Sequence, residues 1–124
     1  MPSHRPRLAG RLLLALALLV AVPALPALAH AILVKASPAA GSTVAGPDLD
    51  VRLRFNSRID GARCHLALAQ PGKPERALAL AAQSAPDQLA ARATGLAPGA
   101  YKLRWQVLAA DGHISRGEVP FQVK

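Results

Sequence analysis

The sequence has little cysteine, methionine or aromatic content. Its 124 residues include one Cys, one Met, one Trp, one Tyr and two Phe. The single Cys64 excludes an intrachain disulfide, so the apolar core must hold the fold without a covalent cross-link. Familiar catalytic signatures are missing as well: there is no Gly-x-Ser-x-Gly elbow, Gly-rich phosphate loop, His-Glu-x-x-His helix or paired-Cys metal motif. We therefore expect a protein that is not an enzyme.

Long apolar runs are absent except near the start of the chain. Residues 12–22 are apolar, follow a positively charged stretch and precede Ala27-Leu28-Ala29. These eleven residues before Pro23 are too few for a membrane-spanning helix, which needs ~20. The three parts are typical of a secretory signal peptide. We expect cleavage after Ala29 and export of the remaining chain.

Removal of residues 1–29 leaves 95 residues, enough for one small domain at 30–124. It also removes three arginines and no acid, which lowers the formal net charge from +8 to +5. The remaining basic residues mostly alternate with apolar ones, as on the solvated faces of strands. This distribution argues against a nucleic-acid partner. We also expect a monomer that does not insert directly into a membrane after cleavage.

Period-two alternation predicts an all-β fold. The clearest strands are 49–55 and 101–107, in which every second residue is apolar. Weaker patterns predict strands at 31–37, 63–68, 76–82, 88–94 and 118–123. Pro120 indicates an edge position or a bulge in the last of these. Seven short strands separated by turn signals predict a Greek-key β-barrel or sandwich of the immunoglobulin-like or cupredoxin-like kind.

Two residues of the third predicted strand carry reactive side chains. Cys64 alternates with Leu66 and Leu68, which favours a buried thiol over a reactive one. His65 has the opposite parity and is interpreted as a solvated strand residue, not as a metal ligand.

His30 and the Asp111-Gly112-His113 turn are the more interesting candidates. Cleavage after Ala29 would give His30 a free α-amine beside its imidazole, and Asp111 and His113 project to the same side. Three nitrogens and one oxygen suit Cu(II), which prefers tetragonal nitrogen and oxygen ligands; Zn(II) would bind the same donors more weakly. From spacing alone, however, a plain polar Asp-Gly turn without a metal is the favoured interpretation.

A resemblance to a known family changes that balance. The motifs that carry it are His30-Ala31-x-Leu33-x-x-Ala36-Ser37-Pro38-Ala39-x-Gly41-Ser42, Leu53-x-Phe55-Asn56, Gly99-x-Tyr101-x-Leu103-x-Trp105-x-Val107 and Asp111-Gly112-His113-x-x-x-Gly117-x-x-x-Phe121-x-Val123. They follow one another across nearly the whole of residues 30–124. In this respect the sequence resembles the CopC family of periplasmic copper-binding proteins.

The resemblance implies a seven-stranded Greek-key β-barrel that binds Cu(II) for copper homeostasis or resistance. It places the metal at His30, through amine and imidazole as a histidine brace, with His113 as a further ligand and Asp111 at or beside the ion. A membrane copper transporter is the implied candidate partner. Some family members bind Cu(I) in a Met-rich loop, but the only Met here is Met1. We therefore expect one Cu(II) site and no thioether Cu(I) site.

Two alternatives remain open at the level of the sequence. Histidine-brace copper sites also occur in oxidoreductases such as polysaccharide monooxygenases, which need a broad substrate platform that one Trp and one Tyr scarcely provide. The other alternative is a β-sandwich interaction module that binds no metal.

Overall fold

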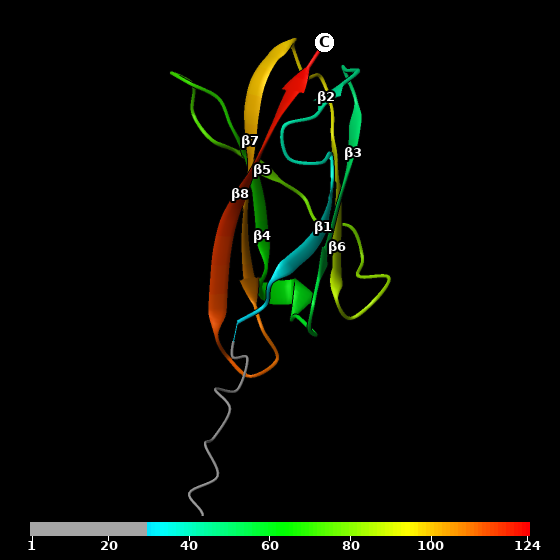
Figure 1. Ribbon diagram of the computed structural model, residues 1–124, viewed down its shortest axis with the longest axis vertical. Helices are drawn as coiled ribbons and strands as arrows, with labels where there is room; N and C mark the ends of the chain where they lie inside the picture. Colours follow the sequence, from blue (N-terminus) through cyan, green and yellow to red (C-terminus); the bar gives the residue numbers. More distant parts are fainter. Residues whose placement is uncertain (1–29) are drawn as a thin grey trace, which may run out of the picture.

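The computed structural model describes residues 30–124, and the predicted signal peptide at 1–29 lies outside the described residues. Eight strands and one short 3-10 helix make up this part of the chain (Figure 1). In chain order they are β1 (Leu33–Ser37), β2 (Thr43–Val44), β3 (Leu49–Phe55), η1 (Gly61–Arg63), β4 (His65–Ala69), β5 (Arg76–Leu78), β6 (Gln88–Ala93), β7 (Gly99–Leu108) and β8 (Ile114–Val123). Nothing helical in residues 30–124 has the length and apolar character needed to cross a bilayer.

The strands form two sheets that face each other (Figure 1). One sheet has the order β1-β3-β6 and the other the order β2-β8-β7-β4-β5. All pairs are antiparallel except the short parallel pair of β2 with β8. The predicted all-β class is confirmed. Because the two sheets remain separate, the arrangement is a sandwich, and the sheets do not close into a barrel.

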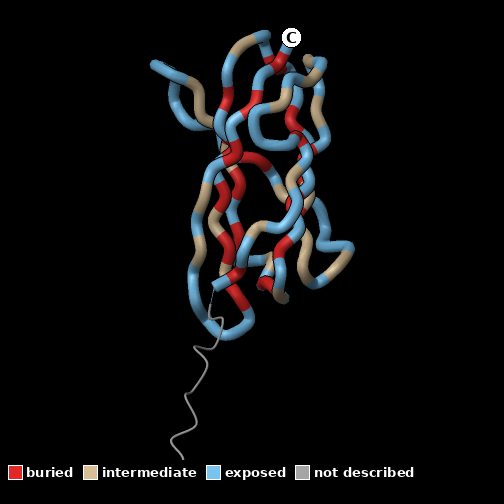
Figure 2. Tube along the Cα trace, in the orientation of Figure 1, coloured by how far each residue is buried: buried red, intermediate tan, exposed pale blue. Residues whose placement is uncertain are grey.

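The core lies between the sheets and follows from the alternation in the sequence. Buried positions recur at every second residue of β3 and β7, and Figure 2 shows this as buried segments alternating with exposed ones along the strands. Phe55 of β3 meets Trp105 of β7 edge to face, with ring centroids 5.2 Å apart, so the aromatic contact joins the two sheets. Burial of a side chain of this size contributes about 1.5–3 kcal/mol to stability.

Trp105 lies against the backbone of the neighbouring strand. It is paired with Gly117 of β8. A Cβ added at Gly117 would lie 2.6 Å from Cε2 of the indole ring, closer than carbon atoms pack. The absence of a side chain at Gly117 therefore creates the space that the Trp105 ring fills.

One predicted strand was too long, and one short strand was not predicted. The expected strand 76–82 was too long, because only β5 pairs with β4, whereas Leu80 bridges Ala91 in the other sheet. The segment thus crosses from one sheet to the other within a few residues, and its uniform Ala and Leu content gives no sign of the crossing. The pair of β2 with β8 was not predicted, because two residues between turn signals carry no periodicity.

The last strand is longer than predicted and begins at Ile114. Pro120 lies opposite Lys102 in an unbroken register, so no bulge occurs there. β8 is not an edge strand, because it lies between β2 and β7 in the sheet. However, β2 pairs only with Gln122 and Val123, so Pro120 itself has a partner strand on one side only, and its carbonyl accepts from the N–H of Gly41 at 2.7 Å. A proline is tolerated in a strand where it need not donate to a neighbouring strand.

Candidate metal centre

The chain segment that carries His30 is fixed by its neighbours. Ala31 is buried, with 3% of its surface exposed. The N–H of Ile32 donates to Oδ1 of Asn56 at 2.8 Å, and the N–H of Asn56 donates to the carbonyl of Ile32 at 2.9 Å. These bonds tie the chain to the end of β3 just after His30, whose own side chain stays exposed.

The Asp111-Gly112-His113 turn joins β7 to β8. The N–H of Gly112 donates to the carbonyl of Ala109 at 2.9 Å, and the N–H of Ala109 donates to the carbonyl of His113 at 2.8 Å. Gly112 has φ +89°, a backbone conformation that residues with a side chain rarely adopt. The sequence feature read as a turn between strands is therefore confirmed, with glycine at the position that requires it.

Asp111 binds His113 within this turn. Oδ1 of Asp111 accepts a hydrogen bond from the backbone N–H of His113 at 3.1 Å and lies 3.3 Å from Nδ1 of the imidazole. The backbone hydrogen bond is the main reason that the pKa of Asp111 lies below its usual value, and the nearby imidazole lowers this pKa further. The Asp111 side chain is 45% exposed, and its lowered pKa keeps it charged at neutral pH beside Nδ1 of the imidazole.

The two histidines come together although they lie near opposite ends of the described chain. The rings of His30 and His113 stand edge to face, with centroids 5.6 Å apart and an interplanar angle of 78°. Figure 1 shows the start of the described chain beside the loop between β7 and β8. The structure thus brings all three predicted site residues to one end of the sandwich, His30 and His113 by ring contact and Asp111 through its contact with His113.

The three side chains do not yet form a closed ligand set. Within residues 30–124, no group of three or more His, Cys, Asp and Glu side chains is close enough together to hold a metal ion. Asp111 is occupied by His113, and the backbone nitrogen of His30 is a peptide nitrogen as long as Ala29 precedes it. Two exposed imidazoles remain, those of His30 and His113, with ring centroids 5.6 Å apart.

The other two candidates lie outside this cluster. Cys64 is buried, its Sγ lies 3.0 Å from the carbonyl oxygen of Asp60, and burial raises the pKa of its thiol. His65 is exposed on β4, opposite Gln106 of β7. The interpretations of Cys64 as a core residue and His65 as a solvated one are both confirmed.

Sequence reasoning assigned no role to Asn56. The residue belongs to a motif that pointed to the family, but its double hydrogen bond to Ile32 forms across 24 positions of sequence. Only its place directly after a clearly alternating strand hinted at a structural role. No local pattern identifies the residue that an amide side chain will contact at that range.

Comparisons with known proteins identify the family. A sequence profile of the CopC domain matches residues 33–124. The crystal structure of CopC from Methylosinus trichosporium OB3b is similar, with 32% identity, a TM-score of 0.68, and coverage of 77% of this chain and 94% of that one. PcoC, described as a methionine-rich copper resistance protein from Escherichia coli, shares the fold at 24% identity and a TM-score of 0.65, covering 77% of this chain and 100% of that one. No protein with a curated functional description matches the sequence. The profile match and the similar CopC structure show that the chain belongs to the CopC family.

Proposed function

We propose that the chain is exported to the periplasm, loses residues 1–29 and there binds a single Cu(II) ion, which it sequesters or delivers. The observation that carries the proposal is the convergence of His30 and His113 at 5.6 Å between ring centroids, in a protein of the CopC family. Copper is the cargo of the protein, and no reaction is assigned to it.

The donors follow from the chemistry of the two histidines. His30 provides its α-amine and an imidazole nitrogen once Ala29 has been removed, and His113 provides a third nitrogen. Because Oδ1 of Asp111 lies 3.3 Å from Nδ1 of His113, that nitrogen carries the proton and Nε2 is left to face the metal. Asp111 then positions His113, and water or the second carboxylate oxygen fills the fourth position. Three nitrogens and one oxygen match the preference of Cu(II).

Copper binding at this site competes with protons. An α-amine has an ordinary pKa of about 7.7–8.0 and an imidazole one of about 6.5, so both lose protons when they bind a metal near neutral pH. Affinity for Cu(II) therefore falls as the pH is lowered. The residues offer no soft sulfur donors for Cu(I): Met1 lies in the segment removed, and Cys64 is buried.

Binding without catalysis also agrees with the placement of the aromatic residues. Trp105, Tyr101, Phe55 and Phe121 make up the aromatic content of the chain, and all four are buried between the sheets. No Phe, Tyr or Trp side chain in residues 30–124 is left on the surface to stack against a sugar ring. A polysaccharide-oxidising activity would lack the platform that it needs.

The decisive experiment changes only the α-amine of His30. We compare the protein that begins at His30 with the same protein acetylated at that amine, by Cu(II) titration and electron spin resonance. We expect the form with a free amine to show three nitrogen donors, and the acetylated form to lose at least about 100-fold in affinity, because acetylation removes the amine from the chelate. Equal affinity in the two forms would contradict the brace. Without copper, both forms should unfold at the same temperature, because His30 is exposed.

A further inference from the structure

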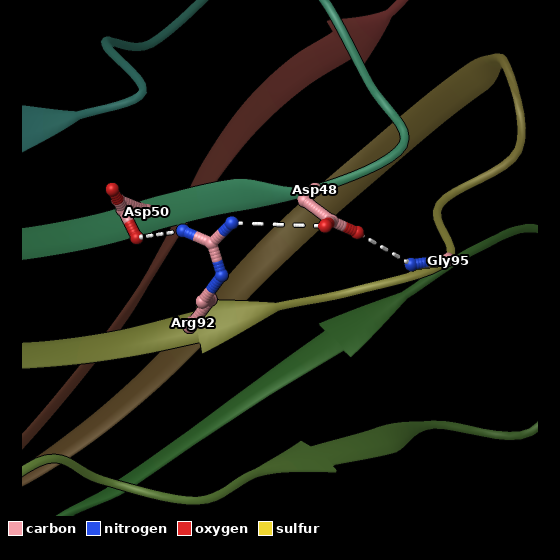
Figure 3. Close-up of polar contacts among 4 residues, drawn as sticks. All are labelled: Asp48, Asp50, Arg92 and Gly95. Carbon is pink, nitrogen blue, oxygen red and sulfur yellow. Dashed lines mark hydrogen bonds and ion pairs between the residues drawn. The ribbon is translucent and has the colours of Figure 1, made fainter.

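The outer face of the smaller sheet, β1-β3-β6, is divided by charge. At one end, Arg92 of β6 lies opposite Asp50 of β3 and is bound by two carboxylates. Its guanidinium is 2.8 Å from Asp50 and 3.6 Å from Asp48, and Asp48 also accepts from the N–H of Gly95 (Figure 3). The charges at this end neutralise one another.

The other end of the same face carries cations without acids. Lys35 of β1 lies directly opposite Arg54 of β3, and Arg52 is two residues before Arg54 on the same exposed side. Among the ion pairs formed within residues 30–124, none includes Lys35, Arg52 or Arg54. The acids of this sheet, Asp48 and Asp50, pair with Arg92 of β6 instead.

These cations border a hollow. It has a volume of about 340 Å³ and is lined by Lys35, Ser37, Arg52, Leu53, Arg54 and Gln88. The lining contains three positive charges, a hydroxyl and an amide, and no carboxylate. Arg52 is flanked by the small residues Ser37 and Ala90 in the paired strands, so its charged group has room around it.

The placement of Lys35 directly opposite Arg54 lowers the stability of the fold. Like charges that face each other on paired strands repel one another. An oppositely charged ligand would remove the repulsion and use the hydrogen-bonding groups of Ser37 and Gln88.

We propose that this hollow binds an extended acidic segment of a partner protein. Residues two apart on one face of a strand are separated by about 7 Å, and an extended peptide with acids at every second position has the same spacing. Its carboxylates can therefore meet Arg52 and Arg54 together, each in the paired geometry that a guanidinium offers a carboxylate. Lys35 supplies a third charge beside them. A concave lining with two neutral hydrogen-bond partners suits a peptide better than the flat surface of a membrane.

The surface is close along the chain to the proposed copper site. Strand β1 provides Lys35 and begins three residues after His30. A partner docked on this face is thus held next to the strand that carries the metal-binding end. The proposal does not depend on copper, because none of the lining residues is a proposed ligand.

The test measures binding of a labelled, capped heptapeptide of alternating glutamate and alanine to residues 30–124 by fluorescence anisotropy. We expect saturable binding that weakens as salt is added. Arg54→Gln should weaken it about tenfold, the loss expected for one charge-assisted hydrogen bond. The matched control is Arg63→Gln, which removes the same charge from an exposed side chain of η1 that does not line the hollow.

Three results would overturn the proposal. One is equal weakening by Arg54→Gln and Arg63→Gln, which would mean attraction to net charge alone. Another is equal affinity for a peptide of the same composition whose glutamates are three residues apart, so that neighbouring glutamates point to opposite sides of an extended chain. The third is binding to vesicles of anionic lipid without binding to the peptide. Unchanged far-ultraviolet circular dichroism of Arg54→Gln, together with the expected loss of peptide binding, would support it.

Discussion

The imidazole rings of His30 and His113 stand edge to face, 5.6 Å apart between centroids, at one end of the sandwich. One ring belongs to the segment that leads into β1, and the other to the turn between β7 and β8, so strands of both sheets position the pair. The proposed copper site can therefore be tested by changing one residue at a time.

Replacement of His113 should remove the proposed site while leaving the fold intact. We expect His113→Ala to weaken Cu(II) binding by more than about 100-fold, because loss of a group that only orients a ligand already costs about 10–100-fold. His65→Ala is the matched control, since His65 is an exposed histidine outside the cluster. Titration of the processed protein with Cu(II) measures both. Equal binding by the two variants would rule out His113 as a ligand.

Asp111 should titrate below its ordinary pKa. The backbone N–H of His113, and then its imidazole, stabilise the charged carboxylate in the folded protein. A lowered pKa in the folded state means that this contribution is present above the ordinary carboxyl pKa of about 3.9 and is lost as the pH falls through the lower folded value. Carboxyl-carbon NMR of the metal-free protein measures the pKa of Asp111. The His113 amide resonance should move with the same midpoint in the wild type and lose that transition in Asp111→Asn.

Gly117→Ala should destabilise the sandwich. Its Cβ would lie 2.6 Å from Cε2 of Trp105, so the indole or the strand must shift. Overpacking of this kind costs about 1–3 kcal/mol. Urea denaturation followed by Trp105 fluorescence gives the change in the free energy of unfolding. A control is Gly72→Ala, whose Cβ meets no atom within 4 Å although its φ of +70° adds backbone strain. A shift of the folded-state emission in Gly117→Ala alone would identify the contact with the ring.

Cys64 should be an unreactive thiol in the folded protein. Burial is the main cause of its raised pKa, which outweighs the opposing backbone hydrogen bond from Leu108. The neutral thiol is thus favoured by folding, and its contribution is full below the ordinary thiol pKa and lost as the pH rises through the folded value. We expect slow reaction with a disulfide reagent at pH 8 and rapid reaction in urea, because the thiolate is the nucleophile. Rapid reaction without denaturant would contradict the burial of Cys64.

Much of the fold could be predicted because it depends on the local alternation of apolar and polar residues. Alternation in 49–55 identified β3 with its observed bounds, and alternation in 63–68 placed Cys64 inside and His65 outside. Local pattern failed where a segment leaves its sheet, as at Leu80, or where two residues pair by proximity alone, as in β2. Periodicity records which side of a strand is buried, not which partner lies beside it.

By itself, the sequence determined the all-β class, the turn at Asp111-Gly112-His113 and, through its motifs, the family. Only the tertiary structure decided that His30 lies against His113 and that Asn56 anchors the segment after His30. It also decided that Lys35 lies opposite Arg54, whereas Arg92 forms the ion pairs with Asp48 and Asp50. The physical reason is the range of the interactions. Turns and strand faces depend on neighbouring residues, whereas each of these contacts joins segments far apart in the chain and exists only once the strands are paired and the sheets packed.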